Sequence, residues 1–120
     1  MTRIALSVLT AAVLAAAAVL APAQAATPVL KGEVGPGFTI EVTKAGKDVK
    51  RLKAGTYKIK IEDKADTHNF HLIGPGVNKS TTVAFVGEKI WRTKLKPGRY
   101  TYQCDPHAAN GMKGTFKVTK

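Results

Sequence analysis

The chain has 120 residues, a formal net charge of +11 and a single cysteine. A chain of this length forms one small domain, and a lone cysteine excludes an intramolecular disulfide. Seven basic residues fall between Lys44 and Lys60, where Asp48 is the only acidic residue. Tyr57 is the only aromatic residue in that segment, so a stacking platform is missing and the composition argues against a nucleic-acid partner.

Residues 1–25 are typical of a secretory signal peptide. Arg3 supplies the positive start, residues 4–20 are predominantly apolar, and Ala23-Gln24-Ala25 has the small-x-small pattern that signal peptidase accepts. An uncleaved anchor is the alternative, because the apolar run is close to the length needed to span a bilayer. We expect export to the periplasm or beyond, and no stable membrane insertion after cleavage. The mature domain would be residues 26–120, and the loss of Arg3 lowers its net charge from +11 to +10.

From residue 28 onward, apolar and polar residues alternate with a period of two, and Gly/Pro turn signals separate the runs. This pattern predicts an all-β, antiparallel Greek-key β-sandwich. The segment from Lys44 to Lys53 is expected to be a loop or a short helical turn. About eight strands are expected, near residues 28–34, 38–43, 56–63, 67–73, 80–86, 89–95, 98–104 and 114–119.

One loop near the C-terminus concentrates potential metal ligands. Cys104 and His107 are three residues apart, and Met112 follows five residues later. A thiolate, an imidazole and a thioether favour a thiophilic transition metal over calcium or magnesium. Two histidines and a cysteine with a weak axial methionine describe a blue-copper site. Zinc could occupy a Cys-His-His set, but a methionine in fourth place makes it the less suitable metal.

The second histidine must come from elsewhere in the chain. His68 is in phase with Phe70 and Leu72, so it should point between the sheets. His71 has the opposite phase and should point away. We therefore expect His68 to be the ligand, although a β-bulge would invert this choice.

The motifs together resemble those of the cupredoxins. They are His68-Asn69, Tyr100-x-Tyr102-x-Cys104-x-Pro106-His107 and Gly111-Met112-x-Gly114-x-Phe116-x-Val118. The Cys-x-x-His-x-x-x-x-Met spacing is that of plastocyanin and pseudoazurin. The resemblance extends over most of the chain from Val29 onward and is strongest from Thr67 to the C-terminus.

The resemblance implies a metal site and its surroundings. His68, Cys104 and His107 would be strong copper ligands and Met112 the long axial one, with one type 1 copper per chain. Asn69 would tie the two ligand-bearing segments together. Because amicyanins carry a non-ligating histidine three residues after the first ligand, His71 would be a bystander. Ala108, Ala109 and Pro75 would form an apolar patch around His107.

The resemblance also implies a function. The chain would be an exported small blue copper protein that shuttles single electrons between redox partners, a monomer and not an enzyme. Its basic charge would suit partners with acidic docking surfaces, or could equally be a solvated face that keeps the protein soluble. A periplasmic or secreted copper carrier with the same ligands is the alternative. A cysteine nucleophile with His107 as its base would leave Met112 without a role, and an inert buried cysteine would make the domain purely structural.

Overall fold

The computed structural model describes residues 10–18 and 26–120. Most of the predicted signal peptide lies outside these ranges, and residues 10–18 have no regular secondary structure. Within the described ranges, no helix is long and apolar enough to cross a membrane.

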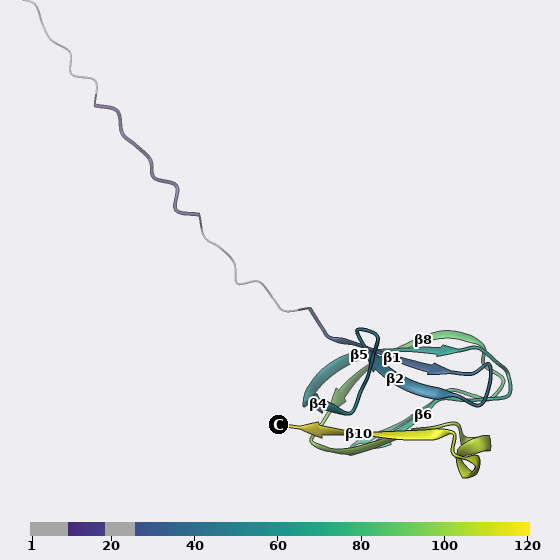
Figure 1. Ribbon diagram of the computed structural model, residues 1–120. Helices are drawn as coiled ribbons and strands as arrows, with labels where there is room; N and C mark the ends of the chain where they lie inside the picture. The colour runs from purple at the N-terminus through teal and green to yellow at the C-terminus, as the bar shows by residue number, and fades with distance from the viewer. Residues whose placement is uncertain (1–9, 19–25) are drawn as a thin grey trace, which may run out of the picture.

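The domain consists of two five-stranded sheets packed face to face (Figure 1). The first sheet has the order β3-β2-β1-β5-β8 and contains β1 (Val29–Val34), β2 (Ile40–Lys44), β3 (Lys47–Asp48), β5 (Gly55–Asp63) and β8 (Gly87–Leu95). The second has the order β4-β10-β9-β6-β7 and contains β4 (Arg51–Lys53), β6 (His71–Gly74), β7 (Val77–Ser80), β9 (Gly98–Gln103) and β10 (Lys113–Thr119). The predicted all-β sandwich is therefore confirmed, with ten strands in place of about eight.

The sheets are mixed: most neighbouring strands pair antiparallel as expected, but two pairs are parallel. β1 runs parallel to β5, and β4 runs parallel to β10. Both parallel pairs arise because the chain changes sheets around residues 44–55. β3 extends the edge of the first sheet, β4 extends the edge of the second, and β5 then returns beside β1. The segment Lys44–Lys53 thus contributes strands, and not the expected loop or helical turn.

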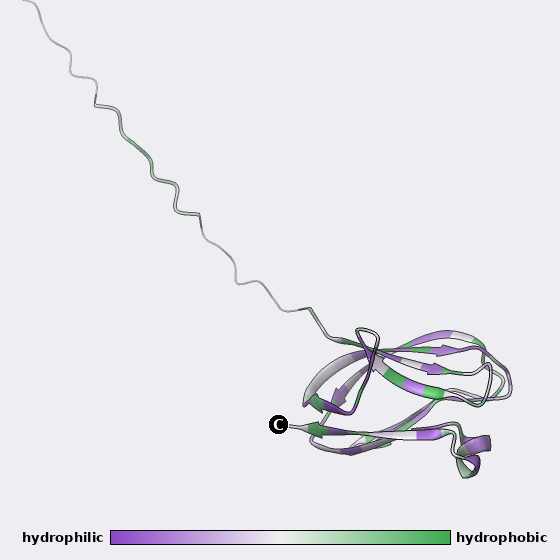
Figure 2. Ribbon diagram, viewed as in Figure 1, coloured by the Kyte–Doolittle hydropathy of each residue, from purple (hydrophilic) through white to green (hydrophobic). Residues whose placement is uncertain are grey.

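Hydrophobic and hydrophilic residues alternate along the strands (Figure 2), and the buried apolar side chains form one core. β5 buries Tyr57, Ile59 and Ile61 while the residues between them face solvent. From the second sheet, Tyr100 and Phe116 stack with their ring centroids 5.3 Å apart. Each strand turns its apolar residues toward the core, because burying one large apolar side chain stabilises a protein by about 1.5–3 kcal/mol. The burial pattern therefore follows the alternation of polar and apolar residues in the sequence.

Two other predicted strands differ from the structure. β7 ends at Ser80, so the expected strand at 80–86 is wrong. Thr81 is held by Phe70, whose N–H donates to Thr81 Oγ1 at 2.8 Å and whose carbonyl accepts from the Thr81 N–H at 3.0 Å. The chain then turns and leaves Val83 and Val86 exposed. The expected strand at 67–73 begins only at His71, so His68 lies in the connection that precedes β6.

The only helical element in the described residues is the 3₁₀ helix η1 (Asp105–Asn110). It follows β9 at the end of the sandwich opposite the C-terminus (Figure 1). Pro106 occupies its first turn, where the missing N–H costs nothing. Gly111 ends it with φ 91°, a left-handed conformation that glycine adopts without strain. This short helix forms most of the predicted ligand loop.

Packing between the sheets sets a first prediction. A Cβ added at Gly32 in β1 would lie 2.7 Å from Phe70 Cζ and 2.9 Å from Ile61 Cδ1. We expect Gly32→Ala to lower the free energy of unfolding by about 1–3 kcal/mol, because both neighbours are fully buried and cannot move aside easily. Gly37→Ala is the control, since nothing lies within 4 Å of its Cβ position. Urea denaturation of both variants checks this, and equal midpoints would contradict it.

Candidate metal centre

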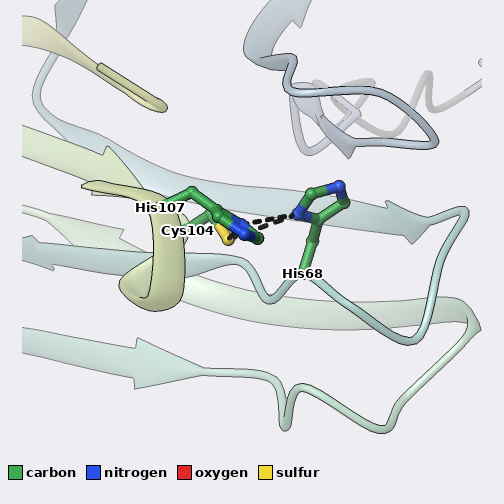
Figure 3. A group of neighbouring side chains, drawn as sticks. All are labelled: His68, Cys104 and His107. Atoms are coloured by element: carbon green, nitrogen blue, oxygen red, sulfur yellow. Dashed lines mark hydrogen bonds between the residues drawn. The ribbon is translucent and has the colours of Figure 1, made fainter. Parts of the chain in front are cut away.

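Three side chains converge at the end of the sandwich that carries η1. His68 comes from the connection before β6, Cys104 directly follows β9, and His107 lies in η1. Figure 3 shows the two imidazoles and the thiol facing one another although His68 is 36 residues from Cys104. Their ligand atoms all lie within 4.8 Å of one another. In the described part of the chain, this is the only such group of three or more metal-ligating side chains.

The spacing of the three ligand atoms fits one transition-metal ion. His68 Nδ1 lies 3.0 Å from His107 Nδ1, and Cys104 Sγ lies 3.6 Å and 3.4 Å from these two nitrogens. A point equidistant from all three atoms is about 1.9 Å from each, close to ordinary metal–nitrogen and metal–sulfur distances of about 2.0–2.3 Å. The donor set of two imidazoles and one thiolate is that of a trigonal copper site. The residues therefore fit copper.

The site is enclosed except on one side. Cys104 and His68 are buried, at 0% and 2% exposure. The ring of His68 is oriented from behind, because its Nε2 lies 3.3 Å from the Pro36 carbonyl oxygen. A hydrogen bond of this kind fixes which nitrogen faces the metal. His107 is half-buried, so its imidazole is the group of the three that reaches the surface.

Backbone hydrogen bonds hold the ligand loop closed. The Cys104 N–H donates to the Met112 carbonyl at 3.0 Å, and the Met112 N–H donates to the His107 carbonyl at 3.2 Å. The His107 N–H in turn donates to the Cys104 carbonyl at 3.1 Å. Met112 is 3% exposed. These bonds place Met112 beside Cys104 and His107. Its role as the axial ligand stays a prediction.

Asn69 and Asp105 join the two segments that carry the ligands. The Asp105 N–H donates to Asn69 Oδ1 at 2.7 Å, and Asn69 Nδ2 donates to Asp105 Oδ2 at 2.9 Å. Asn69 is itself buried, and its amide also donates to Ser80 Oγ at 3.1 Å. Each residue directly follows a ligand in the sequence, so this pair fixes the distance between His68 and Cys104.

His71 lies outside the cluster and faces the other side of its sheet. Its Nδ1 lies 2.8 Å from Asp105 Oδ1, and its Nε2 lies 2.6 Å from Asn78 Oδ1. Partial burial opposes the charged form, but the hydrogen bonds to Asn78 and Asp105 outweigh it and raise the pKa of His71. Desolvation opposes the charged form of Asp105, but hydrogen bonds from Gln103, His71 and Asn69 outweigh it and keep the pKa of Asp105 below its usual range. His71 therefore supports the carboxylate that braces the ligand loop.

Phe38 is a site residue that the sequence pattern misplaced. The alternation through Phe38, Ile40 and Val42 suggested a strand from residue 38, but β2 begins at Ile40 and Phe38 is 71% exposed. Its ring meets His107 and His68 edge to face, with centroid distances of 4.8 Å and 5.6 Å. The sequence Gly35-Pro36-Gly37 just before it is a turn signal that could have predicted this position, because a turn there leaves Phe38 outside the strand.

Pro75 lies away from the site, which corrects the expected patch around His107. Pro75 packs against Gly98 at the start of β9, whereas His107 follows the end of that strand. The apolar surround of His107 is instead completed by Phe38 of the β1–β2 turn.

Asp63 is a further polar residue near the ligands that the sequence did not single out. It is 1% exposed, its Oδ1 accepts the Ala65 N–H at 3.1 Å, and its Oδ2 has no partner among the described residues. Burial raises the pKa of this carboxyl, although the Ala65 hydrogen bond and the nearby His68 oppose the shift.

The His71 contacts predict a pH-dependent contribution to stability. Because the pKa of His71 is higher in the folded protein, its contribution is complete below the unfolded value of 6.5 and is lost as the pH rises through the folded value. We expect His71→Gln to lower the free energy of unfolding most near pH 5.5 and progressively less above pH 7. Denaturation of the metal-free proteins from pH 5 to 9 measures this. A difference that stays constant over the range would contradict it.

Comparisons with known proteins agree with this geometry. Residues 33–119 match the profile of copper binding proteins of the plastocyanin/azurin family. Reduced rusticyanin is 24% identical, with 81% of this chain and 82% of that chain covered and a TM-score of 0.60. Rusticyanin from Thiobacillus ferrooxidans is 24% identical, covering 80% and 79%, with a TM-score of 0.56. Reduced auracyanin from the photosynthetic bacterium Roseiflexus castenholzii is 19% identical, covering 80% and 100%, with a TM-score of 0.53. These structures share the fold, and the profile match shows that the chain belongs to the plastocyanin/azurin family of copper binding proteins, as its resemblance to the cupredoxins implied.

Proposed function

We propose that this protein is an exported blue copper protein that carries single electrons between redox partners. The observation that carries the proposal is the convergence of His68 Nδ1, Cys104 Sγ and His107 Nδ1 on one point. Copper held there would supply one-electron chemistry by alternating between Cu(I) and Cu(II). Met112 would complete the site as the axial ligand, since it is buried and bonded through its backbone to the same loop.

The surroundings of the ligands suit electron transfer because they resist rearrangement. Asn69 and Asp105 lock the two ligand segments together, and the closed loop from Cys104 to Met112 restricts its own three ligands. A site that keeps its geometry in both oxidation states exchanges an electron with little reorganisation. Burial of Cys104 and His68 also keeps water from the metal, which helps to set the potential.

His107 is the proposed exit for the electron. It is the most accessible of the three clustered ligands, and Phe38 extends the apolar surface beside it. Ala108 and Ala109 follow His107 in η1 and carry no charge. A partner could therefore approach the imidazole edge across an apolar surface without desolvating a charged group.

The same observations weigh against the other readings. A copper carrier must release its metal readily, whereas Cys104 and His68 are buried and their loops are bonded to each other. A cysteine nucleophile must meet a substrate, and the Cys104 side chain is inaccessible at 0% exposure. We therefore propose an electron carrier and not an enzyme. Export rests on the sequence of residues 1–25, and a monomer with acidic partners remains our expectation.

Titration of the mature protein, residues 26–120, with Cu(II) tests the proposal. We expect an intense visible band that saturates at one copper per chain, because a thiolate ligand gives copper a charge-transfer absorption. The band should bleach with hydroquinone, return on reoxidation, and be absent from a Cys104→Ser control. Colourless but tight binding would favour a carrier or a zinc site, and a band that does not cycle would remove electron transfer.

Met112→Leu tests the axial position separately. The thioether donates electron density, which stabilises Cu(II) more than Cu(I), so its loss should raise the reduction potential. Each tenfold change in relative affinity for the two oxidation states corresponds to about 59 mV. Voltammetry of the copper-loaded wild type and variant measures the shift. An unchanged potential and spectrum would show that Met112 only packs beside the site.

A further inference from the structure

The outer face of the second sheet carries an uncompensated positive charge. None of its five strands contains an aspartate or glutamate, whereas the first sheet's strands hold six of the eight acidic residues. Five exposed cations point outward from β4, β9 and β10, and we call them the cationic face: Arg51, Lys53, Arg99, Lys113 and Lys117.

Three of these cations stand side by side across neighbouring strands. Lys117 is directly opposite Arg51 on one side and directly opposite Arg99 on the other. Since strands lie about 4.8 Å apart, the row spans only about 10 Å. Like charges directly opposite each other destabilise a sheet. The chain therefore places a repulsive row where neutral residues would be more stable.

The first sheet contains carboxylates that compensate part of its positive charge. Lys31 pairs with Glu33 and Glu62 at 2.8 Å and 3.0 Å, and Lys60 pairs with Glu88 at 3.1 Å. No cation of the cationic face forms an ion pair with any residue in the described ranges. Lys60, which belongs to the basic 44–60 segment of the sequence, is thus partly neutralised. The strands of the first sheet carry eight lysines and arginines with six carboxylates, whereas those of the second carry six with none, so the net positive charge is concentrated on the second sheet.

One end of the cationic face adjoins the metal centre. Lys113 directly follows Met112 and lies opposite Gln103, which precedes Cys104, whereas the row of Arg51, Lys117 and Arg99 lies at the other end of β9 and β10. Between the charges, β9 and β10 present Thr101 and Thr115, directly opposite each other, so the outer side of these two strands offers neither aromatic rings for stacking bases nor apolar groups for insertion into a bilayer. A folded protein that presents carboxylates is the ligand this surface fits.

We propose that the cationic face docks an acidic surface of a redox protein partner. The inference rests on the proposed function, because it identifies the partner of the same copper site. Carboxylates set against Arg51, Lys117 and Arg99 would remove their mutual repulsion and hold the partner on the outer face of the sheet whose other end carries the ligand loop. The attraction would also steer encounter and weaken with added salt.

The test uses the copper-loaded protein and reduced flavodoxin, an acidic one-electron donor, as the probe. The variant is Arg99→Gln with Lys117→Gln. Its matched control is Lys58→Gln with Lys94→Gln, which removes the same charge from exposed positions on the first sheet. Stopped-flow absorbance gives the second-order rate constant between about 10 mM and 500 mM salt.

We expect the cationic-face variant to lose about tenfold in rate at low salt and to show a flatter salt dependence. The control should change less than about threefold. Equal losses in both variants would show that only net charge matters, and no loss in either would remove the docking surface. Either result would overturn the inference.

Separate measurements distinguish the remaining explanations. Reduction by hydroquinone, which is uncharged, should be the same in all three proteins. If the wild type itself is not reversibly reduced by hydroquinone, the proposed function is wrong. If it is reversibly reduced but flavodoxin reduces all three proteins at equal rates, only the docking inference is wrong. Binding of phosphatidylserine vesicles or single-stranded DNA that depends on Arg99 and Lys117, without an effect on the flavodoxin rate, would assign the face to a lipid or nucleic acid and overturn it.

The cost of the charged row can be measured alone. Lys117→Gln removes both repulsive cross-strand pairs, so the urea midpoint of the metal-free protein should rise. A lower midpoint would show that the row does not cost stability and would remove the argument that it is kept for a partner.

Discussion

The metal centre depends on the paired hydrogen bonds between Asn69 and Asp105. The bonds of 2.7 Å and 2.9 Å connect residues 36 positions apart, and each residue directly follows a ligand. Without this tie, His68 would sit in an irregular connection before β6, with only the Pro36 carbonyl to orient its ring. The sandwich brings the two segments to the same end, and the Asn69–Asp105 pair sets their separation on the scale of a metal–ligand distance. His71 and Gln103 then hold the Asp105 carboxylate in place.

The ligand types, the alternating strands and the sandwich could be predicted because each depends on local sequence. Cys104, His107 and Met112 share one loop, and the phase of His68 with Phe70 and Leu72 placed its side chain inward, as its burial shows. That phase argument succeeded although residues 68–70 are not part of a strand. The buried Asn69 shows the limit of the phase argument, since strict alternation would have placed this side chain outside. Its burial depends on partners distant in sequence, which alternation does not encode.

The features that could not be predicted depend on long-range pairing. The parallel pairs β1–β5 and β4–β10 require the chain to change sheets twice, and no local pattern specifies which edge a two- or three-residue strand joins. Phe38 has the same alternation as Ile40, but it lies in the turn between β1 and β2. Its ring therefore covers the histidines instead of entering the core. The prediction that Pro75 lies near His107 was wrong for a related reason. A turn signal does not reveal the end of the sandwich at which the turn lies.

The two sheets divide structural and functional demands between them. The first sheet holds six of the eight acidic residues and pairs three of them with lysines, as expected for a surface that only needs to be solvated. The second sheet contains no carboxylate in its strands, yet it supplies β9 and β10, which enclose the ligand loop. Cations also lie opposite each other on the first sheet, as Lys58 and Arg92 do, but its strands supply six carboxylates, whereas those of the second sheet supply none. Lys117 between Arg51 and Arg99 is a local conflict at no evident structural benefit, and such conflicts are retained where a surface serves binding.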